Sequence, residues 1–393
     1  MNYDFDNLIN RENTGSLKYD YFKERGKPAG LIPMWVADMD FKTAPCIIDA
    51  LKNVADHGIF GYSEPDKNYF PAMRDWFLKH YNFQISQEWH VQTPGVVFAL
   101  AHAVRAFTNI GDSIIIQPPV YYPFSEVILD NDRVLIESPL VRSGDTYVID
   151  FDAFEKKIID NKVVMFILCS PHNPVGRVWT HDELTKLGNI CLRHGVIVIS
   201  DEIHADFVYS GYKHYVFGSL HEDVNQISMI CTSRGKSFNQ AGLQVSDIFI
   251  ANPSMRKKLL VEINKSGYSQ RNTFGLIGAK VAYEHGADWL KSLLKYLECN
   301  RDLIVDFLSK NFPEIRVARC EGTYLAWLDF SNLGIPRDEL LTLITNHAKL
   351  WLDDGLIFGK EGIMHQRMNF GCPRATLKRA LDQLMLLKPF VRS

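Results

Sequence analysis

The stretch VVMFILCSPHNPVGRVWTHDELTKLGNICLRHGVIVISDEIH, residues 163–204, decides the expected fold. Two continuously apolar runs, at 163–168 and 196–200, flank an amphipathic segment at 182–193. Uninterrupted apolar runs of this length are typical of strands that are buried on both faces of a sheet. The Thr-His-Asp-Glu sequence at 180–183 is a helix capping box. The stretch is therefore predicted to form a strand, a helix and a second strand of a parallel sheet.

The same alternation continues on both sides of this stretch. Short β-branched runs at 113–116, 227–231 and 247–251 read as further buried strands, and residues 98–108 read as a helix. We expect an α/β fold in which helices cover both faces of a mostly parallel sheet, within a large domain of residues 46–285.

The pattern changes past about residue 286. A long helical stretch at 289–308 precedes a strand-like run at 322–330, and a helix at 337–347 precedes a β-like run at 366–370. A terminal helix is expected from Ala375. Residues 286–393 are therefore predicted to form a smaller α+β domain, against which the N-terminal residues 1–45 pack.

Composition and charge exclude several classes of function. The chain of 393 residues is 46% hydrophobic and 23% charged, with a net charge of −3. This balance offers no basic surface to nucleic acid or to an anionic membrane, so a small soluble substrate is expected. The polar start and the short apolar runs predict neither a signal peptide nor a membrane helix. Seven scattered cysteines without a CxxC pair favour a reducing cytoplasm over a disulfide framework or a metal site.

Three polar residues follow three of the predicted strands, at the edge where doubly wound sheets bind ligands. Asn173, Asp201 and Lys236 are an amide, a carboxylate and an amine. An amine can form a Schiff base with an aldehyde, a carboxylate can pair with a protonated pyridine nitrogen, and an amide can bond a ring hydroxyl. Each residue alone has an ordinary explanation as a cap, a turn former or a solvated lysine. Together they predict a site for pyridoxal 5′-phosphate (PLP).

Further positions suit the same cofactor. Gly95 opens a predicted helix, whose first N–H groups can face a phosphate, and Ser233 offers a hydroxyl near Lys236. Tyr121 and Tyr122 follow a predicted strand and could offer a flat face to the pyridine ring. Taken alone, they are equally well explained as ordinary half-buried aromatic residues in a turn. Arg367 can clamp a substrate carboxylate with two hydrogen bonds, although alone it reads as a surface residue.

Competing nucleotide motifs fail. Gly235-Lys236-Ser237 imitates the end of a phosphate-binding P-loop, but Ile230 stands where that motif needs its first glycine. No GxGxxG opens a helix, so a dinucleotide site has no support.

Over its whole length the chain resembles the fold-type I PLP enzymes. Within them it is similar to the cystathionine β-lyase/cysteine desulfhydrase branch, the C–S lyases of the MalY/PatB type. The matching words are Trp35–Phe41, Gly61-Tyr62, Pro94–Val97, Val120–Phe124, Ser170–Val178, Ser200–His204 and Lys236–Gln244. The resemblance implies a large domain with a mostly parallel seven-stranded sheet, and a cytoplasmic homodimer with shared active sites.

The resemblance also implies a role for each matching residue. Lys236 would hold the cofactor and later move a proton, and Tyr122 would assist substrate chemistry. Arg367, with Ala37 and Tyr122, would bind the substrate. The remaining cofactor contacts would come from Asp201, Asn173, Tyr121, His204, Gly95, Val96, Val97, Ser233 and, across the dimer interface, Tyr62.

Two departures separate the chain from common aminotransferases of this fold. Gln244 stands eight residues after the lysine, where those enzymes carry an arginine, and His204 replaces their usual tyrosine. Gly235 departs from the serine that is frequent in the lyase branch itself, so that hydroxyl contact is absent. The resemblance implies cleavage of the Cβ–S bond of L-cystathionine, L-cysteine or cysteine S-conjugates. An aminotransferase, or a lyase that also binds a transcription regulator, remains an alternative.

Overall fold

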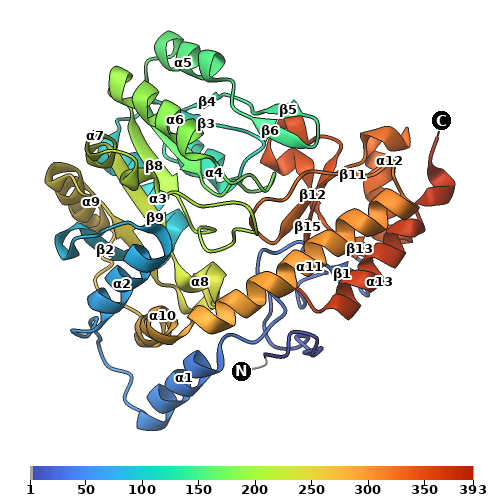
Figure 1. Ribbon diagram of the computed structural model, residues 1–393, viewed down its shortest axis with the longest axis horizontal. Coiled ribbons are helices and arrows are strands. Elements are labelled where there is room, and N and C mark those ends of the chain that lie inside the picture. Colours follow the sequence, from blue (N-terminus) through green and yellow to red (C-terminus); the bar gives the residue numbers. More distant parts are fainter. Residues whose placement is uncertain (1–2, 393) are drawn as a thin grey trace.

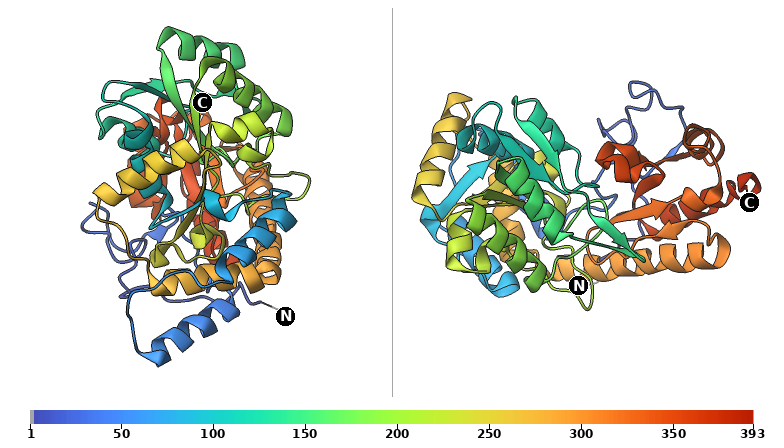
Figure 2. Two further views of the ribbon diagram at one scale, coloured as in Figure 1. Left: turned by 90° about the vertical axis from the view of Figure 1, so that its left-hand side faces the viewer. Right: turned by 90° about the horizontal axis from the view of Figure 1, so that it is seen from above.

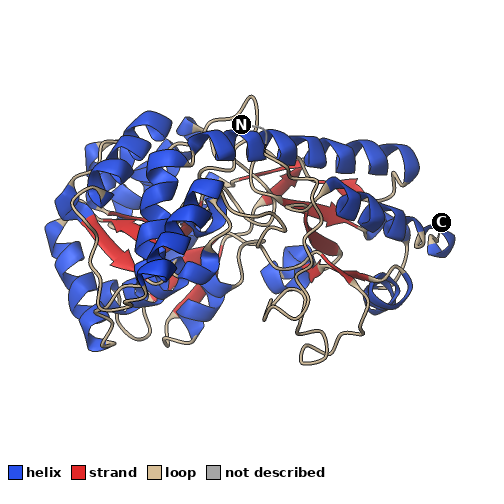
Figure 3. Cartoon of the chain, turned by 90° about the horizontal axis from the view of Figure 1, so that it is seen from below, coloured by secondary structure: helices blue, strands red, loops and turns tan. Residues whose placement is uncertain are grey.

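The computed structural model describes residues 3–392, which form two parts, each built around its own sheet (Figure 1). The larger sheet lies in the first part with helices on both faces, and a smaller sheet lies in the second part (Figure 3). The long helix α11 (Ala287–Asn311) starts beside the first part and runs along the second. The domain limits at residues 45 and 285 stay predictions.

The larger sheet has seven strands within the described residues and confirms the expected mixed, mostly parallel architecture. Six strands run in the same direction, whereas β10 is antiparallel to both of its neighbours, β2 and β9. In sheet order the strands are β2 (His90–Thr93), β10 (Ser246–Phe249), β9 (Ser228–Thr232), β8 (Ile197–Asp201), β7 (Val163–Cys169), β3 (Ser113–Ile116) and β4 (Val134–Glu137).

The central strands are apolar throughout because helices bury both of their faces. On β7, Met165 and Ile167 belong to an apolar cluster with α3, α4 and α9, whereas Phe166 and Leu168 belong to the cluster that includes α5 and α6. The helices of this part are α1 (Pro45–His57), α2 (Tyr69–Tyr81), α3 (Val96–Phe107), α4 (Pro123–Leu129), α5 (Phe151–Asp160), α6 (His181–His194), α7 (Glu222–Gln226), α8 (Arg234–Ser237), α9 (Pro253–Lys265) and α10 (Thr273–His285). The capping box predicted at the start of α6 is present, with Thr180 and Glu183 bonded reciprocally.

The second part carries a four-stranded sheet in the order β11 (Arg316–Val317), β12 (Leu325–Asp329), β15 (His365–Asn369) and β14 (Asp353–Asp354). Helices α11, α12 (Arg337–Thr342) and α13 (Arg374–Met385) accompany it (Figure 2). Near the N-terminus, β1 (Ile32–Pro33) pairs with β13 (Leu350–Trp351), which ties residues before α1 to this part. A two-stranded ribbon is formed by β5 (Val141–Ser143) and β6 (Thr146–Val148).

Several expected elements differ from the observed ones. The strands β2 and β4 were not predicted, because His90–Thr93 is polar and short and Val134–Glu137 lies at the partly exposed sheet edge. The strand expected from residue 322 begins only at Leu325, since Thr323 adopts a positive φ of 68°. The helix expected at 337–347 is α-helical to Thr342 and continues as a π-turn.

None of the helices at 3–392 combines the length and apolarity needed to cross a membrane. Within the same residues, no group of three or more His, Cys, Asp or Glu side chains is placed to hold a metal ion.

Candidate active site

The carboxyl ends of three neighbouring strands meet at one edge of the larger sheet. In the parallel register, Asp201 at the end of β8 lies opposite Cys169 of β7 and Cys231 of β9. Asn173 follows β7 by a short turn, and Lys236 lies on the one-turn helix α8 just after β9. The three residues singled out from the sequence therefore line one cavity.

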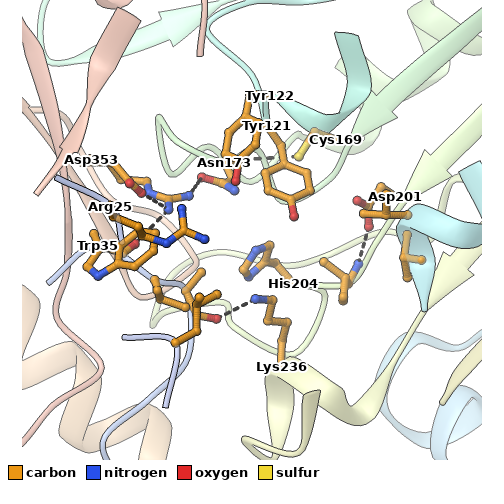
Figure 4. A pocket seen from close by; sticks show the side chains of 17 residues that line it. Arg25, Trp35, Tyr121, Tyr122, Cys169, Asn173, Asp201, His204, Lys236 and Asp353 are labelled. Carbon is orange, nitrogen blue, oxygen red and sulfur yellow. Dashed lines mark hydrogen bonds and ion pairs between the residues drawn. The ribbon is translucent and has the colours of Figure 1, made fainter. Parts of the chain in front are cut away.

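Lys236 is a partly buried amine that contacts the N-terminal part of the chain. Its Nζ donates a hydrogen bond of 2.5 Å to the backbone oxygen of Ala37 (Figure 4). Burial lowers the pKa of Lys236 to about 8, and the charge of Arg367 adds to this effect. At pH 7 about a tenth of this amine is therefore uncharged and nucleophilic, far more than for an ordinary lysine.

Asp201 is a buried carboxyl group with few partners. It is 4% exposed, and its Oδ1 accepts a hydrogen bond of 3.1 Å from the backbone N–H of Ile203. Burial raises the pKa of Asp201 to about 7, against the opposing effects of that hydrogen bond and of the Lys236 charge. No ion pair joins Asp201 to a cation among the residues of the structure. A cationic ring nitrogen placed beside it would stabilise the ionised carboxylate.

Arg367 lies on β15 and reaches the cavity from the second part of the molecule. It is 3% exposed, so its interpretation as a surface residue is wrong. Its guanidinium donates hydrogen bonds of 3.0 Å to Asn173 Oδ1 and to the backbone oxygen of Trp35, and it pairs with Asp353. The Nε of Arg367 is buried without a hydrogen-bond partner in residues 3–392. Three of its five N–H groups are thus used within the described residues, which leaves Nε–H and one Nη1 N–H for a ligand such as a carboxylate.

Aromatic and apolar side chains complete a cavity of about 280 Å³. Tyr121 and Tyr122 stand on the wall beside Asn173, opposite Lys236 (Figure 4). Burial raises the pKa of both phenols, so both are neutral hydrogen-bond donors near pH 7. His204 is buried with its Nδ1 unpartnered in the described chain, and burial lowers its pKa far below the usual value. The other lining residues are Leu17, Arg25, Trp35, Val36, Ala37, Val96, Val97, Cys169, Ile203 and Asp353.

Three of the predicted cofactor residues lie outside this lining. The Ser233 hydroxyl caps α8, since it accepts from Gly235 N–H and donates to the Val245 carbonyl. Gly95 lies at the N-terminus of α3, where an added Cβ would meet no atom of residues 3–392 within 4 Å. Tyr62 is 93% exposed. The roles predicted for the site residues stay predictions.

A buried ion pair that the sequence did not suggest fixes the position of α8. Arg234 is 2% exposed, and its Nη1 lies 2.6 Å from Asp206 Oδ2. Asp206 also accepts from Tyr81 and Ser237. Because Arg234 and Ser237 both belong to α8, this network holds the helix that carries Lys236. In the sequence, only the position of Arg234 two residues before Lys236 could have indicated it.

Comparison with known proteins identifies the family. The sequence profile of the aminotransferases of class I and II matches residues 30–384. The chain belongs to the class I and II aminotransferase family. Its seven-stranded sheet and the cluster of Lys236, Asp201 and Asn173 at the strand ends are thus features of a family member.

The most similar members of this family include named lyases. The chain is 40% identical to the cystathionine β-lyase PatB of Bacillus subtilis (strain 168), over 97% of this chain and 98% of that one. It is 36% identical to cystalysin from Treponema denticola, a structure that contains PLP, with a TM-score of 0.95 and coverage of 99% and 100%. The PLP-bound C–S lyase from Staphylococcus hominis is 32% identical, with a TM-score of 0.92 and coverage of 100% and 99%.

Proposed function

We propose that the protein is a PLP-dependent carbon–sulfur β-lyase. It cleaves L-cystathionine, and also L-cysteine or cysteine S-conjugates, to a thiol, pyruvate and ammonia. The observation that carries the chemistry is the single cavity that joins a partly buried amine, Lys236, a buried carboxyl without a cation in residues 3–392, Asp201, and a buried arginine with an unpartnered N–H, Arg367. The similarity to a cystathionine β-lyase over 97% of the chain supports the substrate class.

The residues present fit PLP in chemistry and in position. Asp201 would face the ring nitrogen, Asn173 would face the ring oxygen, and Tyr121 would lie against the ring. The N-terminus of α3 at Gly95, Val96 and Val97 leaves open space for the phosphate, and no side chain of residues 3–392 caps its first N–H groups. When bound, PLP supplies an aldehyde that holds the substrate amine and a pyridinium ring that accepts the electron pair released at Cα.

The protein groups then have separate tasks. The Arg367 guanidinium holds the α-carboxylate and so fixes the orientation of the Cα–H bond. Lys236 Nζ, whose pKa is lowered to about 8 by burial, accepts the α-proton near neutral pH. The phenol of Tyr122 is neutral and can donate a proton to the leaving thiolate. Loss of the thiolate from Cβ, followed by hydrolysis, gives pyruvate and ammonia.

We also propose that the active sites are shared between two chains. The Tyr62 side chain projects into solvent beside the exposed apolar residues Ile59 and Phe60. Such a patch supports a contact with a second copy of the chain, through which Tyr62 would reach the partner's phosphate.

The decisive test measures pyruvate release from L-cystathionine by the wild type and by Lys236→Ala. We expect turnover by the wild type and none by the variant. Borohydride should attach the cofactor to the wild type alone. Transfer of the amino group to an added α-keto acid, without pyruvate release, would instead indicate an aminotransferase. Persistent turnover and borohydride coupling in Lys236→Ala would reject the assignment of the lysine.

A further inference from the structure

The active-site cavity shares one wall, which includes Trp35, with a neighbouring hollow. A second hollow of about 320 Å³ adjoins the cavity around Lys236. Four residues line both spaces: Arg25, Trp35, Tyr122 and Asp353. We refer to the two adjoining hollows together as the cleft. Lys236 and Asp201 line only the first hollow, whereas Arg25 lies on the wall that the two share.

Arg25 is held in place although it is exposed to solvent. Its guanidinium lies 4.8 Å from the centre of the Trp35 ring (Figure 4). Trp35 in turn stacks on Trp351, with ring centres 4.3 Å apart and planes 8° from parallel. Phe22 also packs against Trp351, and its carbonyl accepts a hydrogen bond of 2.8 Å from Lys27, which closes the turn around Arg25. This stacking reduces the entropy lost when the guanidinium binds an anion.

The positive charge of Arg25 is not used by the protein itself. No carboxylate of residues 3–392 forms an ion pair with it. The two acids that line the second hollow pair with other arginines. Asp353 pairs with Arg367, and Asp354 pairs with Arg337. The charge of Arg25 nevertheless affects a neighbouring group in the cleft, Asp353. Burial raises the pKa of Asp353, whereas Arg367 and, more weakly, Arg25 oppose that rise.

We propose that Arg25 binds a carboxylate at the far end of the leaving thiol. This inference rests on the proposed lyase function and names its substrate class: cysteine S-conjugates whose thiol ends in a carboxylate, as the homocysteine half of cystathionine does. The α-carboxylate is held at the inner end by Arg367, the thioether chain passes between Trp35 and Tyr122, and the distal carboxylate meets Arg25. Arg25 is thus a specificity-determining residue, and it takes no part in bond cleavage.

The kinetic test compares two substrates that differ in the distal group. These are S-(2-carboxyethyl)-L-cysteine and S-propyl-L-cysteine, with pyruvate release by the holoenzyme as the readout. Arg25→Gln should lower kcat/KM for the carboxylated conjugate about 1.5- to fivefold, the range for a solvent-exposed ion pair, and leave the propyl conjugate unchanged. Arg25→Lys should restore part of the preference. Lys23→Gln removes a cation from the same turn that lines neither hollow, and it should leave both substrates unaffected.

A binding test keeps the inference independent of turnover. L-2-Aminoadipate and L-norleucine have no leaving group at Cβ and differ in the distal carboxylate. Calorimetry on the wild-type holoenzyme should show tighter binding of aminoadipate, with a preference that falls as salt rises. Arg25→Gln should abolish that preference.

Equal effects of Arg25→Gln on both compounds of either pair, or no effect, would overturn the proposal for Arg25. Failure of the wild type to release pyruvate from either conjugate would refute the lyase function. In that case the role of Arg25 is decided by the binding test alone, which compares L-2-aminoadipate with L-norleucine.

Discussion

The Asp201→Asn substitution tests whether the buried carboxyl group of Asp201 needs a cation from the cofactor, because none of the described residues pairs with it. Burial raises the pKa of Asp201 from 3.8 to about 7. A pKa difference of about 3 corresponds to about 4 kcal/mol, at 1.36 kcal/mol per pH unit. Because the folded-state pKa is raised, the contribution of Asp201 to stability is complete below pH 3.8. It is lost as the pH rises through about 7.

Asparagine does not titrate, so the cofactor-free variant should gain stability over the cofactor-free wild type as the pH rises. The quantity to compare is the free energy of unfolding of the variant minus that of the wild type. Relative to its value well below pH 3.8, this difference should be about 2 kcal/mol larger at pH 5 and about 4 kcal/mol larger at pH 8. Groups that titrate in both proteins, such as Lys236, cancel to first order in this difference.

Guanidinium denaturation followed by tryptophan fluorescence measures this difference at equal protein concentration. Asp56→Asn, which removes an exposed carboxylate from α1, controls for the change in net charge. With PLP bound the order should reverse, since the cofactor stabilises the wild type more than the variant. A difference that stays constant within about 0.5 kcal/mol from pH 5 to pH 8 would refute the reasoning.

Three further predictions concern the other site residues. Arg367→Ala should mainly raise KM, with a loss in kcat/KM of about 2–4 kcal/mol and little change in cofactor absorbance, and unaltered kinetics would remove Arg367 from the substrate site. The rate at which the cofactor-free protein takes up PLP should rise with pH around a midpoint near 8, because burial lowers the pKa of Lys236 to about 8 and only the neutral amine attacks the aldehyde. Arg367→Ala should move that midpoint upward, and a rate independent of pH between 7 and 9 would contradict the assignment. Mixing Lys236→Ala with Tyr62→Ala and allowing subunit exchange should give more activity than the sum of the two, because one site per mixed dimer is then intact. If mass measurement confirms subunit exchange and activity still does not recover, Tyr62 does not act in the partner's site.

Much of the larger sheet could be predicted because its strands carry their own signal. The runs at 163–168 and 196–200 are apolar without interruption, and the structure places them at the centre of the sheet as β7 and β8. Elements at the sheet edges lack this signal. Val134–Glu137 of β4 is partly exposed, and its strand identity comes from pairing with β3.

Some residues of the candidate site could likewise be predicted from the sequence, and others could not. Lys236, Asp201 and Asn173 could be found because each follows a recognisable strand, and a parallel sheet brings strand ends to one edge. The phosphate contact predicted for Ser233 from its position near the lysine stays a prediction. What its position in the sequence did not indicate is that its hydroxyl caps α8.

The sequence by itself determined the family, the parallel sheet and the identity of the cofactor-facing groups, because these depend on local periodicity and on residue type at strand ends. Only the tertiary structure decided the ionic state of those groups and the reach of the cleft. The lowered pKa of Lys236 and the raised pKa of Asp201 arise from burial. Arg25 lies more than 200 residues before Lys236, and Arg367 lies on the other sheet. Their approach to one cavity depends on how the two parts of the chain pack, which no local pattern encodes.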